Sequence, residues 1–329
     1  MIDHPAADPG RRTEIAAFHD HGPPPADFRA LFLAGLLREE KSVADHMLLD
    51  RRSPAFLRIT ALPEYYLARA ELEILRGYSG AIAAATGPCA QLIDLGLGFG
   101  AQAALLLAML DRPWGYVAVD HEYAALLEDA RRVQARYPKL WVEAVRADMR
   151  EAFDMPSNAG GGRRLAYLPG GVIGDCAPAD ALALLSLWAR ELRPGALMLI
   201  GVDLRKSVLI LESAYDDPHG LNAEWLFDLL RRANRELPAD FDIRLFEHRV
   251  DFDAAKGRVR AALRSVAAQD VSIGSRLVHF AEGERLEVAQ SWKYSVEDFQ
   301  ALARGAGLRP VDVWLDAKAL FSVHLLAVG

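Results

Sequence analysis

The chain has 329 residues, of which 52% are hydrophobic and 25% are charged, and its formal net charge is −7. This composition is typical of a globular protein that forms one large domain with an insertion or two domains. The negative balance argues against a nucleic-acid groove and against binding to an anionic membrane surface.

The N-terminal residues 1–27 predict a flexible arm, because Pro, Asp and His stand where a secretory signal would carry an apolar run. No stretch of ~20 apolar residues follows, so we expect no membrane span. The two cysteines, Cys89 and Cys176, lack metal-ligand spacing and a disulfide framework. These features predict a cytoplasmic protein without a structural metal.

Residues 92–100, LIDLGLGFG, predict a buried parallel strand that opens into a tight turn before a helix. Asp94 ends the apolar run, and Gly96, Gly98 and Gly100 allow a ligand to lie against the main chain. The acid can accept hydrogen bonds from cationic and hydroxyl groups of that ligand. The glycines with Ala101 also match G-x-G-x-x-A of dinucleotide folds, which leaves an NAD-dependent reductase open. Asp94 favours a methyltransferase, because S-adenosylmethionine has an amino-acid end and no pyrophosphate.

Four more apolar segments alternate with helical ones, and three of them end in or near an acid. They span residues 115–120, 141–149, 165–175 and 196–204, and the acids are Asp120, Asp148 and Asp175. Alternating strands and helices predict a mostly parallel sheet with helices on both faces. Ligands of such sheets bind at the carboxyl ends of the strands. We therefore expect Asp120 to hold ribose hydroxyls and Asp148, with Met149, to lie against the adenine. Between these strands, residues 158–164, NAGGGRR, predict a flexible loop.

Beyond residue 204 the pattern changes to a helical segment, then alternating antiparallel strands, a helix and a final strand. We expect an antiparallel insertion between the fifth and last strands of the parallel sheet. The predicted domains are a substrate-binding domain of residues 28–62 and 208–290, and a cofactor-binding core of residues 63–207 and 291–329.

Several motifs resemble one known family. They are ITALPEYYLARAELEIL from residue 59, YLPGGVIGD, GVDLRKSVLILESAYDD, NRELPADFD, GERLEVAQSWKY and the closing FSVHLLAVG. Over residues 41–329 the chain resembles the histidine Nα-methyltransferases of ergothioneine biosynthesis. The resemblance implies a Rossmann-like class I methyltransferase core with an α+β substrate-binding insertion, and S-adenosylmethionine as the cofactor.

The resemblance also implies a substrate pocket, in which this chain keeps some family residues and changes others. Tyr65, which also borders the cofactor, Tyr215 and Ser291 are retained. The family glutamate that binds imidazole is Ala289 here, and the asparagine that binds the substrate carboxylate is Asp175. The expected substrate-binding residues are Tyr65, Gly171, Asp175, Tyr215, Ala289, Ser291 and Leu48, which replaces a family tyrosine. A family lysine after the glycine loop aligns with Gln102.

These changes predict a different substrate. Losing an acceptor for a buried donor costs ~1–3 kcal/mol, and a carboxylate would repel a substrate carboxylate within ~4 Å. We expect N-methylation of a small amine, amidine, guanidine or amino-acid derivative by a monomer or weak dimer, with Asp175, Tyr65 and Tyr215 as catalytic residues. One alternative is histidine Nα-methylation to hercynine; another is a non-catalytic protein that binds the cofactor or an amine.

Overall fold

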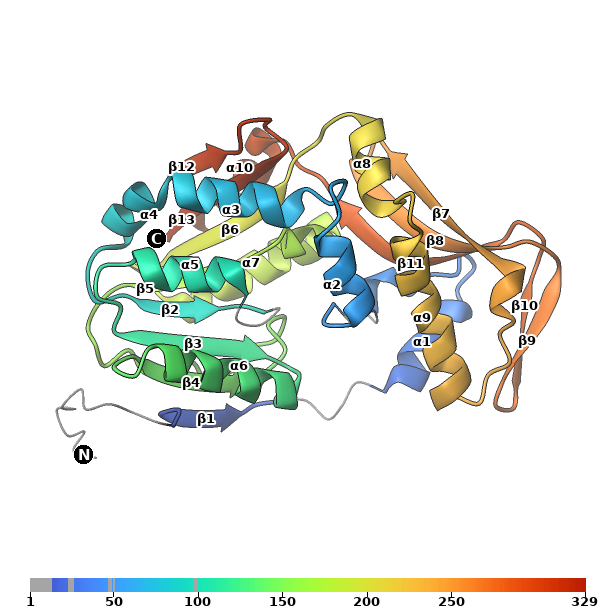
Figure 1. Cartoon of the computed structure of the whole chain (residues 1–329), viewed down its shortest axis with the longest axis horizontal. Coiled ribbons are helices and arrows are strands. Elements are labelled where there is room, and N and C mark those ends of the chain that lie inside the picture. The colour runs from blue at the N-terminus through green and yellow to red at the C-terminus, as the bar shows by residue number, and fades with distance from the viewer. Residues whose placement is uncertain (1–13, 23–26, 47–48, 50, 97–99) are drawn as a thin grey trace.

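The computed structural model describes residues 14–22, 27–46, 49, 51–96 and 100–329. Its centre is an eight-stranded sheet with the order β1-β4-β3-β2-β5-β6-β13-β12 (Figure 1). Neighbouring strands from β1 to β6 pair in parallel, whereas β13 is antiparallel to both β6 and β12. This order confirms the predicted Rossmann-like class I methyltransferase core. The strands are β1 Ala17–Asp20, β2 Gln91–Asp94, β3 Gly115–Asp120, β4 Trp141–Arg146, β5 Arg164–Leu168, β6 Leu197–Asp203, β12 Leu308–Leu315 and β13 Phe321–Val328.

Helices cover both faces of this sheet because successive strand residues point to opposite sides. Leu92 of β2 belongs to the hydrophobic cluster under α3, α4, α5 and α6, whereas its neighbour Ile93 belongs to the cluster under α7 and α10. All four residues of β2 are buried, as expected for a central parallel strand. The helices are α3 Leu67–Gly77, α4 Ser79–Thr86, α5 Ala101–Met109, α6 Tyr123–Arg136, α7 Pro178–Leu192 and α10 Val296–Gly305.

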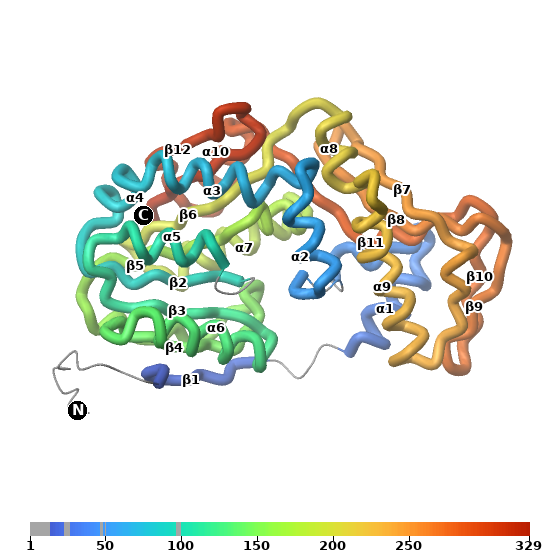
Figure 2. The backbone as a smooth tube through the Cα atoms, viewed as in Figure 1, coloured from blue at the N-terminus to red at the C-terminus, as the bar shows by residue number. Residues whose placement is uncertain are grey.

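A second group of elements packs beside the carboxyl ends of the parallel strands. A three-stranded antiparallel sheet, β11-β8-β7, and the hairpin β9–β10 form its β part. In Figure 2 the early helix α2 lies beside the late helix α9, and these two helices are in contact. The remaining elements are α1 Phe28–Leu36, α2 Pro54–Thr60, α8 Val208–Tyr215, α9 Leu221–Glu236, β7 Phe246–Asp253, β8 Arg258–Ser265, β9 Gln269–Ile273, β10 Arg276–Phe280, β11 Arg285–Trp292 and the short 3-10 helices η1 Ala44–His46, η2 Val172–Asp175 and η3 Ile243–Leu245. We retain the predicted division into two domains as a proposal.

Three local predictions are wrong. Residues 17–20 of the expected flexible arm form β1, which pairs in parallel with β4. The segment before the last strand adds an unpredicted edge strand, β12. Asp175 lies in η2 and not at the end of β5, because a glycine turn separates the two elements. Among the described residues, no helix is both long and apolar enough to span a membrane.

Candidate active site

The predicted cofactor residues at the ends of β2 and β3 line one pocket. The two strands are parallel neighbours, so Asp94 and Asp120 reach the same edge of the sheet. The pocket has a volume of only about 10 Å³, and Gly96 and Arg52 also line it. The structure therefore brings together three of the residues that the sequence assigned to the cofactor.

Asp94 presents a buried acceptor in this pocket. The hydroxyl of Tyr116 donates a hydrogen bond to its Oδ2 over 2.8 Å. Its Oδ1 is buried and has no hydrogen-bond partner among the described residues. Burial raises the pKa of Asp94 to about 8. A cationic ligand would restore the ionised form, so this carboxyl suits the amino-acid end of S-adenosylmethionine.

The turn after β2 requires glycine. Gly96 has φ +115, a conformation that side chains rarely adopt, and a Cβ there would lie 3.9 Å from the sulfur of Met149. Met149 is therefore next to the glycine turn, as a residue beside the cofactor should be. Gly100 precedes α5 as its N-cap, and Gly98 lies outside the described residues.

Asp148, predicted to touch adenine, is held by Arg150. The Arg150 Nη2 donates to its Oδ2 over 2.7 Å, and the Arg150 backbone N–H donates to its Oδ1 over 2.9 Å. Burial raises the pKa of Asp148, but these hydrogen bonds outweigh it and leave the pKa below its usual value. Asp148 does not line the pocket that contains Asp94.

Arg52 was missed by the sequence analysis. Its guanidinium forms an ion pair with Asp120, the predicted ribose ligand, and its Nη1 lies 3.1 Å from Asp129 Oδ2. A cofactor ribose that bonds to Asp120 must share that carboxylate with Arg52 or displace it. The sequence shows two consecutive arginines, Arg51 and Arg52, just before a helix that begins at Pro54. Nothing in the sequence indicates which carboxylates they contact.

Several of the predicted substrate residues contact one another. The rings of Tyr65 and Tyr215 are 6.5 Å apart and nearly perpendicular. The Tyr215 hydroxyl donates to Ser291 Oγ over 3.0 Å. Ala289 precedes Ser291 by two residues on β11 and so shares its face. Leu48 lies outside the described residues.

We call the group formed by Tyr65, Tyr215 and Ser291 the tyrosine chamber, and Lys293 connects it to the core. Its side chain is 0% exposed, and its Nζ donates to the Tyr215 hydroxyl over 2.7 Å and to Ser291 Oγ over 2.6 Å. The same Nζ pairs with Asp203 at 2.6 Å, and Lys206 pairs with the other oxygen of Asp203. The tyrosine and serine are thus fixed by a buried ionic network.

Asp175 is not the uncompensated anion that the sequence predicted. Arg51 forms an ion pair with its Oδ2, and the side chains are 23% and 10% exposed. Burial raises the pKa of Asp175, although Arg51 and Lys293 oppose this. The sequence comparison missed Arg51, whose guanidinium also lies over the Phe56 ring at 5.6 Å.

The turn before η2 places Asp175 against β11. Gly171 has φ +72, and a Cβ there would contact Phe321, Asp203 and Leu67 at 3.5–3.7 Å. Gly174 lies so close to β11 that a Cβ would come within 2.7 Å of a backbone oxygen. Two glycines are therefore needed to bring the Asp175 carboxyl to the chamber.

Consecutive arginines join the two halves of the site. Arg51 reaches Asp175 in the tyrosine chamber, and Arg52 reaches Asp120 in the acid-lined pocket. The backbone of these two adjacent residues therefore connects the chamber and the pocket. This arrangement can hold a nucleoside-bearing cation beside a small polar molecule.

Comparisons with known proteins identify the family to which the chain belongs. A family model described as a SAM-dependent, histidine-specific methyltransferase matches residues 28–328. The histidine N-alpha-methyltransferase of Mycobacterium tuberculosis is 34% identical over 301 residues, which cover 89% of this chain and 92% of that protein. The N-methyltransferase imqF of Aspergillus flavus is 23% identical over 308 residues, covering 90% and 84%.

A solved S-adenosylmethionine-dependent methyltransferase from Clostridium acetobutylicum is 13% identical, with a TM-score of 0.45, and covers 83% of this chain and 98% of that structure. The family assignment rests instead on the family match and on the mycobacterial relative. The chain belongs to the family of SAM-dependent, histidine-specific methyltransferases and is a SAM-dependent N-methyltransferase.

Proposed function

We propose that this enzyme methylates the amine nitrogen of a small amino-acid-derived substrate other than free histidine. The observation that carries this proposal is the Arg51–Asp175 ion pair beside Tyr65 and Tyr215. S-adenosylmethionine would supply an electrophilic methyl group, and Asp94 would hold its amino-acid end. We further propose that Asp120 and Asp148 serve the ribose and the adenine.

The protein must mainly align a neutral nitrogen with the methyl carbon. Positioning of this kind can supply ~7–11 kcal/mol of the barrier. Burial raises the pKa of Tyr65 far above its usual value, so its hydroxyl stays protonated and orients the substrate by hydrogen bonding. We propose that Tyr215, fixed by Lys293 and Ser291, does the same. Asp175 would accept the amine proton through water and become neutral, which would leave the positive charge of Arg51 available to an anionic group of the substrate.

The chamber's charges support a substrate that carries an anionic group as well as an amine. Arg51 pairs with Asp175, and Lys293 contacts Tyr215 and Ser291, so two cations border this group of residues. Among the described residues, only Asp175 forms an ion pair with Arg51, and guanidinium can bind a second carboxylate through its other N–H groups. Ala289 offers no acceptor for an imidazole N–H, which argues against histidine.

Matched substrate pairs test this proposal. Purified enzyme with S-adenosylmethionine is incubated with L-amino acids and with their decarboxylated amines, and mass spectrometry detects added methyl groups. We expect methylation of an amino acid and at least ~10-fold lower kcat/KM for its decarboxylated partner. Arg51→Gln should remove this preference and leave the affinity for S-adenosylhomocysteine unchanged. Efficient turnover of decarboxylated amines by the unmodified enzyme would refute the role of Arg51.

Histidine is the second candidate substrate, favoured by the retained Tyr65, Tyr215 and Ser291 and by the mycobacterial relative. The same methylation assay distinguishes the two candidates, because a histidine methyltransferase would show the highest kcat/KM of the panel with histidine. If Ala289 and Asp175 are the residues that disfavour histidine, then Ala289→Glu combined with Asp175→Asn should raise histidine turnover. A protein that binds S-adenosylhomocysteine but methylates nothing would instead be a non-catalytic family member.

The proposed setting is the cytoplasm, supported by two free cysteines that form no disulfide. The proposed form is a monomer or weak dimer without nucleic-acid partners, supported by the net charge of −7. Light scattering across a concentration series tests the oligomeric state.

A further inference from the structure

A second pocket lies at the opposite edge of the central sheet from the active site. It has a volume of about 990 Å³ and is lined by the loop after β4 and by the turn between α7 and β6. Arg164 begins β5, and Ala196 directly precedes β6. The pocket therefore opens at the amino ends of these parallel strands, whereas the proposed cofactor site lies at the carboxyl ends.

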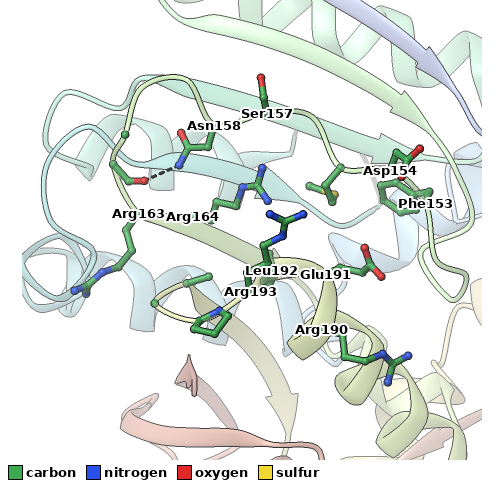
Figure 3. Close-up of a pocket in the computed structure, with 16 residues that line it drawn as sticks. Phe153, Asp154, Ser157, Asn158, Arg163, Arg164, Arg190, Glu191, Leu192 and Arg193 are labelled. Atoms are coloured by element: carbon green, nitrogen blue, oxygen red, sulfur yellow. Dashed lines mark hydrogen bonds between the residues drawn. The ribbon is translucent and has the colours of Figure 1, made fainter. Parts of the chain in front are cut away.

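Two guanidinium groups converge in this pocket without a carboxylate between them. Figure 3 shows the side chains of Arg164 and Arg193 extending toward each other, while Arg163 and Arg190 point away. Burial and the positive charge of Arg193 lower the pKa of Arg164, and the carboxylate of Glu143 only partly opposes this shift. Asp154 and Glu191 also line the pocket, but neither forms an ion pair with an arginine in the part of the chain that the structure describes.

The two arginines differ in their hydrogen bonds within the protein. The Nε of Arg164 donates to Gln91 Oε1 over 3.1 Å, and its Nη2 donates to the Pro156 carbonyl over 2.5 Å. The guanidinium of Arg193 has no hydrogen bond or ion pair within the described residues. The guanidinium of Arg164, which is held by hydrogen bonds, and that of Arg193, which is not, thus face the same pocket.

Arg193 occupies this position at a conformational cost. Its φ of 66° and ψ of 162° lie in a region that is almost restricted to glycine. Such outliers persist where the surrounding structure imposes them, and they cluster at ligand sites. The conformation turns this side chain from the end of α7 toward Arg164.

The opposite wall of the pocket is fixed, contrary to the predicted flexible loop at residues 158–164. A Cβ on Gly162 would overlap the Cys89 carbonyl oxygen at 1.8 Å, and one on Gly160 would overlap the Trp114 ring at 2.2 Å. Asn158 Nδ2 donates to the Gly162 carbonyl over 2.6 Å, as Figure 3 shows. Backbone packing therefore holds the loop that delivers Arg164.

We propose that this pocket binds a small molecule that carries a phosphate group, with Arg164 and Arg193 gripping the phosphate oxygens. A phosphate monoester carries up to two negative charges, which match the two guanidinium groups, and its oxygens accept bidentate hydrogen bonds. The volume leaves room for an organic part beyond the phosphate. The site is separate from the methyl-transfer centre and would be occupied independently of it.

Calorimetric titration of the full chain at low salt tests this site, with inorganic phosphate and ribose 5-phosphate as probes. We expect saturable binding of both probes, competition between them, and no effect of saturating S-adenosylhomocysteine. Arg193→Gln should weaken binding at least ~10-fold. Arg190→Gln removes the same charge from a side chain that points away, so it should change the affinity less than ~3-fold.

A second variant separates ligand binding from folding. Arg193→Gly relieves the backbone strain, so it should unfold at a higher temperature than the wild type and yet lose phosphate affinity. Equal losses in Arg190→Gln and Arg193→Gln would overturn the proposal, because the effect would be general electrostatics. Absence of saturable binding, or displacement of the probes by S-adenosylhomocysteine, would also overturn it.

Discussion

The titration of Asp94 gives the sharpest prediction for the cofactor pocket. Burial raises the pKa of this carboxyl to about 8 in the ligand-free protein. On that value roughly one Asp94 in a hundred is ionised at pH 6, one in eleven at pH 7 and half at pH 8. If only the ionised form binds a cationic amino group, S-adenosylhomocysteine should bind about 50-fold more tightly at pH 8 than at pH 6.

Isothermal titration calorimetry measures both parts of this prediction. At pH 7, binding should release about 0.9 proton, which is measured by repeating the titration in buffers with different ionisation enthalpies. Asp94→Asn should weaken binding and abolish both the pH dependence and the proton release. The matched control is Asp148→Asn. Because the pKa of Asp148 lies below its usual value, this variant should keep the increase of S-adenosylhomocysteine affinity with pH. A flat affinity in the wild type, or an unchanged slope in Asp94→Asn, would refute the reasoning.

Three further substitutions probe the buried charges. Burial raises the pKa of the fully buried Glu71 to about 7. Its contribution to the free energy of unfolding is therefore complete below the unfolded pKa of roughly 4.5, and about 3 kcal/mol is lost as the pH rises through the folded pKa. Glu71→Gln should remove this loss, which urea unfolding at pH 5 and pH 8 measures. Lys293→Met should cost on the order of 3 kcal/mol of unfolding free energy, because it strips a buried partner from Asp203, and it should also lower kcat by releasing Tyr215. Arg52→Gln should tighten S-adenosylhomocysteine binding, because it frees Asp120 for the ribose; weaker binding would mean that Arg52 is itself a cofactor ligand.

The sequence correctly placed Asp94 and Asp120 at the same edge of the sheet because local patterns determine this placement. An apolar run that ends in an acid before glycines identifies both the strand and the turn, and neighbouring parallel strands place their final residues at one edge. Asp94 and Asp120 are therefore brought together without any knowledge of side-chain packing. The edge strand β12 was missed because Pro310 lies within it, at a register shift between Pro310 and Asp312, and proline argues against a strand.

The arginines could not be predicted in the same way. Arg51 and Asp175 are 124 residues apart, and Arg52 and Asp120 are 68 residues apart. Neither pair has a periodic or local signal, and a long flexible side chain can reach many partners. The sequence analysis therefore treated Asp175 as an isolated carboxylate, whereas in the fold Arg51, from the loop before α2, forms an ion pair with it.

That loop contacts both groups of candidate ligand-binding residues, because Arg51 pairs with Asp175 and Arg52 pairs with Asp120. A ribose that bonds to Asp120 must share its oxygens with existing donors or displace Arg52, because Oδ1 accepts the backbone N–H of Glu122 at 2.9 Å and Oδ2 accepts from the Arg52 guanidinium. Where that displacement shifts the loop backbone, it also shifts Arg51, which is bonded directly to Arg52 and pairs with Asp175. Such coupling is reciprocal for binding: whatever factor the cofactor applies to substrate affinity, the substrate must apply to cofactor affinity. The arginine pair that the motifs do not contain is thus the part of the chain best placed to adjust both affinities together.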